Sequence, residues 1–242
     1  MEKKVTEAIN FRRSTRLYKT TPLDDAKVKE CLKNASLAPT SSNLQLWEFY
    51  HITDKATLNQ LAEACFNQSA AKTAQQLVII VARKDLWRKR AKANIEFLNT
   101  VYNKPNLSER ELKRKKMATN YYSKLIPTIY MDFFGILGFI KYIVFQIIGL
   151  FKPIYRQTRL SDMRIVAHKS AGLAAQNFMM SMAAIGYDTC PMEGSDTLRV
   201  KQILKLPRGA EINMVISCGI RDDKGIYGPR FRVPFENVYF KI

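Results

Sequence analysis

Three arginines and two hydroxyl side chains lie within five residues near the start of the chain, in the segment RRSTR at residues 12–16. A guanidinium binds phosphate through two parallel hydrogen bonds, and hydroxyl groups add shorter ones. Near the other end, Arg230 and Arg232 are two residues apart, so in an extended chain both side chains point the same way and could bind one phosphate. Each segment alone is also compatible with a solvated basic loop or a charged edge strand.

Two other segments have residues that suit the edge of a flat heterocyclic ligand. Residues 38–45, APTSSNLQ, put small polar side chains on a loop that leaves a predicted helix. In residues 190–194, CPMEG, Gly194 has no side chain, so the backbone N–H groups there can come close to a ligand. The alternative for both segments is an ordinary turn at the end of a helix.

The spacing of apolar residues predicts the elements that position these segments. Residues 77–82, LVIIVA, form a short apolar run that is typical of a strand covered on both faces. Helices and strands mix without a regular βαβ order, which favours an α+β fold. We expect helices at about 2–10, 24–38, 54–65 and 161–185, a short helix capped by Ser195 or Asp196, strands at 47–53, 77–82 and 212–220, and an extended tail at 232–242.

Composition is that of a globular protein, with 242 residues of which 47% are hydrophobic. We therefore expect one domain over residues 1–242. The four cysteines are widely spaced without a CxxC pair, and there are only two histidines, so no metal site is expected. The N-terminal residues have no apolar run behind their charges, so we expect no secretory signal, and a cytoplasmic protein with reduced thiols.

The chain is strongly basic, and the basic residues are unevenly distributed. The formal net charge is +18, and residues 83–124 contain 13 basic and 4 acidic residues, so this stretch carries about half of the excess. A cationic surface attracts nucleic acid, anionic lipid headgroups or phosphate-bearing cofactors. No helix-turn-helix, RRM or OB pattern surrounds the basic stretch near Trp87, so we expect no nucleic-acid partner, although a basic nucleic-acid-binding protein stays an alternative.

The order of five motifs resembles the nitroreductase family. They are an N-terminal RRSxRxY, a helix ending in APxSxNxQ, a strand beginning at Trp47, a GYDTCPMEG segment and the basic pair near the C-terminus. The resemblance covers about residues 5–82 and 161–242 and departs from the family at Leu46, often a proline, and Ala70, often a flavin-contacting lysine. It implies a dimeric α+β fold with a mixed, mainly antiparallel sheet flanked by helices, and FMN as cofactor with NADH or NADPH as electron donor.

The resemblance also implies a role for individual residues. In the family, the RRSxR segment and the C-terminal basic pair bind the FMN phosphate and ribityl chain, the PMEG segment lies near flavin N5, and an Asn after a Phe bonds the pyrimidine edge. The loop after the second helix reaches the flavin of the partner subunit in a homodimer. The matching residues are Arg12, Arg13, Ser14, Arg16, Arg230 and Arg232 for the phosphate, Glu193 and Gly194 near N5, Asn67 with Gln68 at the pyrimidine edge, and Thr40, Ser41 and Asn43 from the partner.

The reaction that this resemblance implies is ping-pong hydride transfer. A nicotinamide reduces the flavin and leaves, and a small organic acceptor such as a quinone or nitroaromatic then takes the electrons. No side chain is expected to act as a catalytic acid or base. A reductive dehalogenase or flavin-fragmenting enzyme of the same superfamily, or a flavin-binding protein without turnover, stays an alternative, because the substrate-determining middle of the chain lies outside the resemblance.

The middle of the chain, at about 84–160, reads as a basic and apolar insertion. Residues 133–151, FFGILGFIKYIVFQIIGLF, are interrupted only by Lys141 and Gln146 and have about the length of a membrane span. A single crossing would place the two halves of one flavin site on opposite sides of the membrane, so we reject it. The segment at 126–151 either contacts the anionic inner face of a membrane, which would make the protein peripheral and its acceptor lipid-soluble, or forms a lid or dimer arm.

Overall fold

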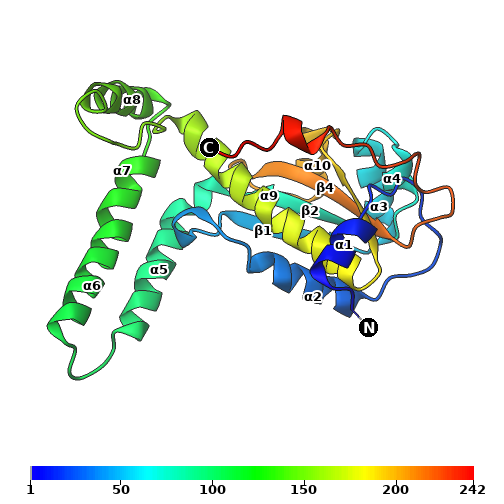
Figure 1. Ribbon diagram of the computed structural model, residues 1–242, viewed down its shortest axis with the longest axis horizontal. Coiled ribbons are helices and arrows are strands. Elements are labelled where there is room, and N and C mark those ends of the chain that lie inside the picture. The colour runs from blue at the N-terminus through cyan, green and yellow to red at the C-terminus, as the bar shows by residue number, and fades with distance from the viewer. Residues whose placement is uncertain (1) are drawn as a thin grey trace.

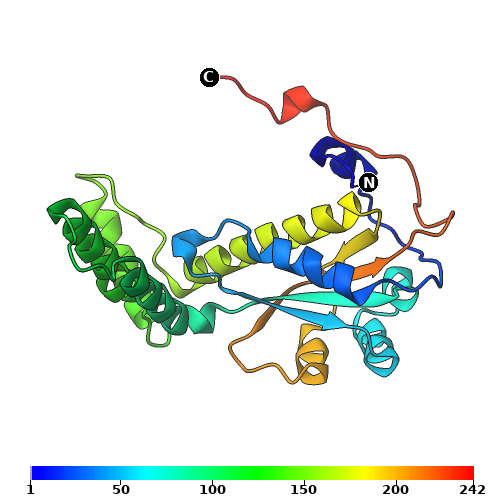
Figure 2. The same ribbon diagram turned by 90° about the horizontal axis from the view of Figure 1, so that it is seen from below.

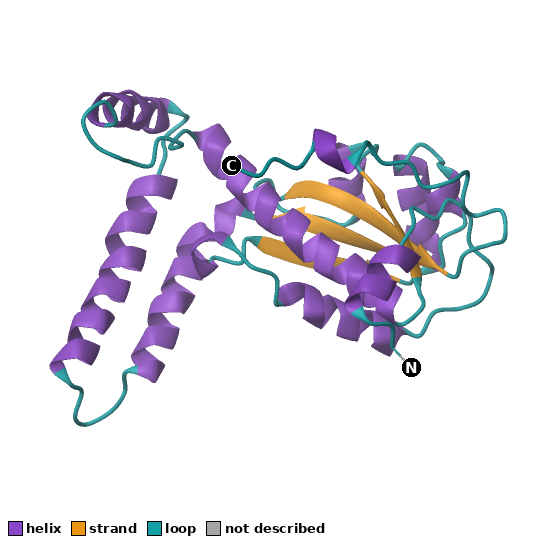
Figure 3. Cartoon of the chain, in the orientation of Figure 1, coloured by secondary structure: helices purple, strands orange, loops and turns teal. Residues whose placement is uncertain are grey.

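The computed structural model describes residues 2–242, and its centre is a four-stranded antiparallel sheet (Figures 1 and 3). The strand order is β1-β2-β4-β3, with β2 and β4 in the middle. The strands are β1 (Trp47–Ile52), β2 (Gln76–Ala82), β3 (Asp188–Met192) and β4 (Glu211–Gly219). All three strand pairs are antiparallel. The expected α+β fold with a mainly antiparallel sheet is therefore confirmed.

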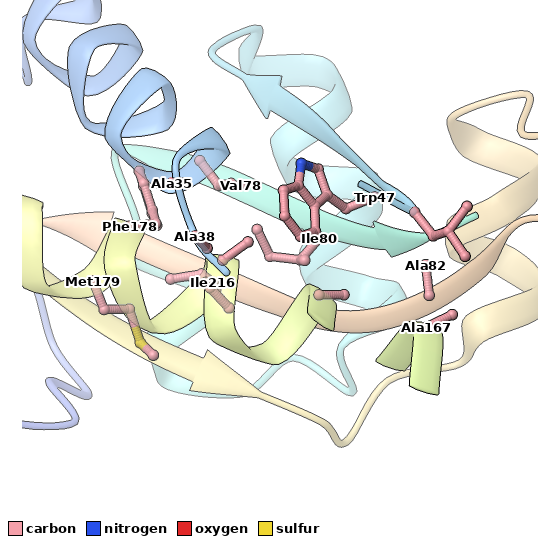
Figure 4. Packing of buried hydrophobic residues seen from close by; sticks show 14 of the residues in the cluster. Ala35, Ala38, Trp47, Val78, Ile80, Ala82, Ala167, Phe178, Met179 and Ile216 are labelled. Carbon is pink, nitrogen blue, oxygen red and sulfur yellow. The ribbon is translucent and has the colours of Figure 1, made fainter. Parts of the chain in front are cut away.

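One face of the sheet is covered by α2 (Asp25–Ser36) and α9 (Leu160–Ala184). Because side chains alternate along a strand, Val78, Ile80 and Ala82 of β2 all point to this face. They pack with Ile216 of β4 and with Phe178 of α9, which is fully buried (Figure 4). Asp24 caps α2 by accepting hydrogen bonds from the N–H groups of Ala26 and Lys27.

The opposite face of the sheet packs against three shorter helices. Leu77, Ile79 and Val81 point to this side and join Leu61 and Val200 in a second apolar cluster. Every residue of β2 is buried, which explains why its sequence is apolar without alternation. Asp54 and Asp196 cap the first and last of these helices. The helices are α3 (Lys55–Ala64), α4 (Ser69–Lys72) and α10 (Thr197–Ile203).

The expected helix at 2–10 is shorter than predicted and runs from Val5 to Phe11 as α1, beside the C-terminal end of α9. The segment DTCPM, expected as part of a turn, is the edge strand β3 instead. Its Pro191 stands on an outer strand, which is where a sheet tolerates a residue without an N–H. The tail is extended as expected except for η4 (Phe235–Asn237), a single 3-10 turn, and it leads away from the sheet (Figure 2).

The basic and apolar middle of the chain forms a helical arm that projects from one end of the sheet (Figure 1). A short 3-10 turn, η2 (Lys84–Leu86), leads into α5 (Trp87–Val101), and α6 (Glu109–Asn120) returns alongside it. The π-helical turn η3 (Tyr121–Leu125) and α7 (Ile126–Tyr130) then connect to α8 (Ile136–Ile148). We call residues 87–148 the arm. The expectation of a single domain over residues 1–242, with the arm as an insertion, stays a prediction.

The apolar run at 126–151 is two helices rather than one. The chain breaks between α7 and α8, where Gly135 has a φ of 86°, a conformation that glycine adopts without steric cost. Among residues 2–242, no helix is both long and apolar enough to cross a membrane.

Candidate active site

The RRSTR segment lies beside the edge strand β3. Ser14 forms an isolated parallel bridge with Thr189, and the N–H of Thr15 donates to the Thr189 carbonyl at 3.3 Å. Thr15 is fully buried, whereas Ser14 before it is exposed and Arg16 after it is partly exposed. The N–H of Arg16 donates to the carbonyl of Gly225 at 2.7 Å, which joins this segment to the start of the C-terminal tail.

A buried ion pair lies where β3 begins, next to the RRSTR segment. Asp188 at the start of β3 is 3% exposed and accepts hydrogen bonds from the N–H and Nε of Arg221 at 2.9 and 2.8 Å. Arg221 also donates to the carbonyl of Phe11 at 2.9 Å. The pair therefore ties β3, the end of β4 and the end of α1 together. Sequence reasoning missed both residues, because nothing in their local sequence shows that residues 33 positions apart pair.

The C-terminal tail lies beside the RRSTR segment, so the arginines of the two segments come close together. The guanidinium of Arg230 donates to the carbonyls of Asn10 and Arg12 at 2.9 and 2.7 Å, and Arg13 donates to the carbonyl of Gly228 at 2.5 Å. Between the two segments lies a cavity of about 320 Å³. Its lining residues are Arg12, Arg13, Ser14, Arg16, Ile226, Tyr227, Gly228, Pro229, Arg230, Phe231 and Arg232.

We call Arg12, Arg13, Arg16, Arg230 and Arg232 the arginine cluster. No acidic residue lines its cavity. Burial, followed by the repulsion of Arg230 and Arg232, lowers the pKa of Arg12 below its ordinary value. Like charges held together in this way bind an anion favourably, because it relieves their repulsion and accepts their hydrogen bonds. The donor set fits a phosphate group such as that of FMN.

A second group of site residues meets at the far end of β3. The side-chain amide of Gln68 donates to the carbonyl of Gly194 at 2.8 Å. The N–H of Asp196 donates to the carbonyl of Ala64 at 2.8 Å, so the turn after β3 is joined to the end of α3. Asn67 has a φ of 52°, which turns the chain sharply before α4. The structure therefore brings Asn67 and Gln68 together with Glu193 and Gly194.

These two groups lie along one strand. Ser14, which lies between the N-terminal arginines, pairs with Thr189 near the start of β3, and Gly194 follows the end of the strand. Burial is the main influence on Cys190 and raises its pKa, so the thiol is protonated at neutral pH. A ligand with a phosphate at one end and a ring at the other can follow this edge.

The third predicted group does not join the other two within one chain. Thr40, Ser41 and Asn43 lie in and before the 3-10 turn η1 (Ser41–Asn43), which packs against the arm. The Asn43 side chain donates to the Asn94 side chain of α5 at 2.8 Å, and Ser42 bonds the hydroxyl of Tyr121 at 2.6 Å. Figures 1 and 2 place the loop between α2 and β1 at the end of the sheet opposite the loop between α1 and α2.

Comparison with known proteins identifies the family. The family model described as "Nitroreductase family" matches residues 9–220. Protein DrgA of Synechocystis is 27% identical over 218 residues, which cover 90% of this chain and 84% of that protein. An NADH dehydrogenase of Thermus thermophilus is 26% identical, with 94% and 90% of the two chains covered. The crystal structure of a nitroreductase from Exiguobacterium sibiricum in complex with FMN has the same fold, with a TM-score of 0.69, 21% identity and coverage of 99% and 98%. The chain belongs to the nitroreductase family.

Proposed function

We propose that the protein is an NAD(P)H-dependent FMN oxidoreductase that holds the FMN phosphate in the arginine cluster. The observation that carries the proposal is the cavity between the RRSTR segment and the tail, which arginines line without any acidic residue. The relatives support it, since one is named an NADH dehydrogenase and another was solved with FMN. Bound FMN supplies the two-electron chemistry, because a flavin takes hydride from a nicotinamide and reduces a second molecule.

The residues of the chain bind and orient the cofactor. Arg12, Arg13, Ser14, Arg16, Arg230 and Arg232 hold the phosphate and ribityl chain. At the other end of β3, the backbone of Glu193 and Gly194 would lie near the reactive edge of the ring, and Asn67 and Gln68 would bond its pyrimidine edge. The hydrogen bond between Gln68 and the Gly194 carbonyl keeps these two loops at a fixed separation. No side chain is assigned a proton-transfer step.

The functional unit is a homodimer in which Thr40, Ser41 and Asn43 reach the flavin of the partner subunit. Two features of the chain support this. The loop that carries these residues lies away from the arginine cluster of its own chain (Figure 1). The tail, which leaves the body in Figure 2, has large apolar side chains that another chain would cover: Phe231, Val233, Phe235, Val238, Tyr239 and Phe240 are 51–76% exposed. Sedimentation velocity should give a species of twice 27.9 kDa.

The acceptor is a small organic molecule such as a quinone or a nitroaromatic, and it replaces the oxidised nicotinamide in a ping-pong cycle. Ping-pong order would follow from the donor and the acceptor using the same site beside bound FMN in turn. Steady-state rates measured against NADPH at several fixed quinone concentrations should give parallel double-reciprocal lines. Intersecting lines would mean that both substrates bind at once and would contradict the ping-pong order.

The phosphate role is tested by comparing FMN with riboflavin, which lacks only the phosphate. Two charge-assisted hydrogen bonds of about 1.5–3 kcal/mol each give FMN an advantage of at least roughly 100-fold. Titration of the apoprotein, followed by quenching of flavin fluorescence, measures both affinities. Equal affinities for the two flavins would show that the arginine cluster does not bind the phosphate.

A further inference from the structure

The two polar side chains of α8 are turned toward the protein. Lys141 donates to the carbonyls of Thr128, Ile129 and Met131 at 3.0, 3.2 and 2.7 Å, in and just after α7, where carbonyls lack partners within the helix. The Gln146 side chain accepts a hydrogen bond from Arg156 at 2.7 Å. A surface helix in water normally points its polar residues outward. In α8 the orientation is reversed.

The outward face of α8 is apolar along its whole length. Ile136, Ile140, Ile143 and Ile147 follow helical spacing and are 43–57% exposed. Aromatic residues extend this surface at both ends. The apolar patch comprises Phe133, Phe134, Ile136, Leu137, Phe139, Ile140, Ile143, Val144, Ile147, Leu150 and Phe151, and its most exposed members are Phe134 at 89% and Phe151 at 84%.

The apolar patch is large for a protein surface in water. Its eleven side chains present on the order of 1,000 Å², whereas the largest patch on a typical monomer is about 300–600 Å². Gly138 lies on the opposite side of α8, where an added Cβ would meet the backbone N of Leu160 at 3.1 Å. Close packing on that side fixes which face of the helix is exposed.

The surroundings of the apolar patch are basic. Residues 124–156, which include the apolar patch, contain four lysines and arginines and one acidic residue, Asp132. The Asp132 carboxylate faces inward, because one oxygen accepts a hydrogen bond from the N–H of Gly138 at 2.8 Å and the other is buried. Lys124 and Lys152 are exposed just before α7 and just after the apolar patch. An apolar surface next to uncompensated positive charge is complementary to an anionic lipid bilayer.

The dimensions of α8 allow it to lie on a bilayer and not to cross one. Thirteen residues at 1.5 Å each give a helix of about 20 Å, shorter than the roughly 30 Å of a hydrocarbon core. Both ends of α8 lead back to the body, through α7 on one side and into α9 on the other. The helix can therefore bury its outward face among the acyl chains while its inward face stays on the protein.

We propose that the apolar patch docks on the anionic surface of a lipid bilayer, with Lys124 and Lys152 at the level of the headgroups. This surface function is independent of the flavin chemistry and goes beyond it.

Flotation of the purified holoprotein with vesicles tests the proposal. We expect it to float with vesicles of phosphatidylcholine containing phosphatidylglycerol, less with phosphatidylcholine alone, and less at high salt, which screens the lysines. Ile140→Glu combined with Ile143→Glu should reduce the bound fraction at least about tenfold, because a carboxylate is costly to insert. Leu198→Glu is the matched control, since Leu198 is also exposed, at 64%, but lies on α10. It should float like the unaltered protein.

A milder variant keeps the test decisive if the double variant does not fold. The four native cysteines are all buried, so Ile147→Cys can be labelled selectively with an environment-sensitive fluorophore. Its emission should shift to the blue with anionic vesicles, and that of labelled Leu198→Cys should not. Failure of the unaltered protein to float, or equal flotation of the Ile140→Glu/Ile143→Glu variant, would overturn the proposal. So would dissociation of the dimer, or of a larger assembly, by this variant, because the apolar patch would then be a contact between copies of the chain. NADPH oxidation with a water-soluble quinone, measured on the same samples, reports separately on the flavin reaction.

Discussion

Asp188 and Arg221 form an ion pair in which Nη2 lies 2.5 Å from Oδ1, and the Asp188 side chain is only 2% exposed. The pair holds the start of β3 against the end of α1, because Arg221 also bonds the Phe11 carbonyl. The RRSTR segment continues from α1 and contacts β3 at Ser14 and Thr15. The position of the arginine cluster therefore depends on two residues that do not line its cavity.

Replacing Asp188 should destabilise the fold and weaken flavin binding together. Asp188→Ala leaves a partly buried guanidinium without its partner, which typically costs about 3–5 kcal/mol. Urea unfolding measures the free energy, and fluorescence quenching measures FMN affinity. Glu30→Ala, which removes an exposed ion pair with Lys33, should change stability by less than about 1 kcal/mol. Similar small effects on stability in both variants would show that the Asp188–Arg221 pair does not hold β3 against α1.

Replacing Arg230 should weaken FMN binding and leave riboflavin binding unchanged. Its guanidinium is exposed, so Arg230→Ala removes a phosphate donor, while the bonds of Arg13 to Gly228 and of Arg16 to Gly225 still hold the N-terminal segment against the tail. Loss of about 1.5–3 kcal/mol corresponds to roughly 10- to 100-fold weaker binding. Arg199→Ala, on the surface of α10, is the control and should bind FMN normally. A parallel loss of riboflavin affinity would contradict a phosphate-specific role.

A side chain at position 194 should obstruct the ring site without unfolding the protein. A Cβ on Gly194 would meet only the Gln68 amide, at 3.4 Å, which is ordinary contact. Gly194→Ala should therefore keep the thermal transition while FMN affinity falls, because the backbone can no longer approach the ring closely. Gly172→Ala in α9, where nothing lies within 4 Å, should leave affinity unchanged and raise stability by about 0.5–1 kcal/mol. Normal FMN affinity of Gly194→Ala would remove Gly194 from the ring site.

The buried thiols should make the protein less stable at alkaline pH. Burial raises the pKa of Cys31 and of Cys65 to about 11. Thiols of the unfolded chain ionise near pH 8.5–9, so the folded state binds more protons between about pH 9 and 11, and the free energy of unfolding falls as pH rises through that window. The loss is on the order of 2 kcal/mol per thiol.

Urea unfolding at pH 8 and pH 11 measures this loss. The difference in unfolding free energy between the two pH values should be smaller in Cys65→Ala than in the unaltered protein. An equal difference in both would show that Cys65 does not contribute to the alkaline loss.

The sequence predicted the elements whose burial pattern is local. Apolar spacing predicts β2 and α2, and the order of the motifs identifies the family. Contacts between distant parts of the chain were not predictable. The hydrogen bonds from Arg230 to the carbonyls of Asn10 and Arg12 are an example, because the local sequence does not show which segment the tail contacts. β3 was missed because it is short and contains Pro191. The inward orientation of Lys141 and Gln146 was not predictable either, because it depends on contacts of α8 with α7 and with the segment before α9.

The central claim is that the chain binds FMN and passes electrons from NAD(P)H to an organic acceptor. The most direct test is the absorption spectrum of the purified protein, reconstituted with FMN and titrated anaerobically with NADPH or NADH. The flavin band should bleach with one equivalent of reductant and return when a quinone or nitroaromatic is added. A protein that takes up no FMN, or whose bound flavin neither nicotinamide reduces, would contradict the claim.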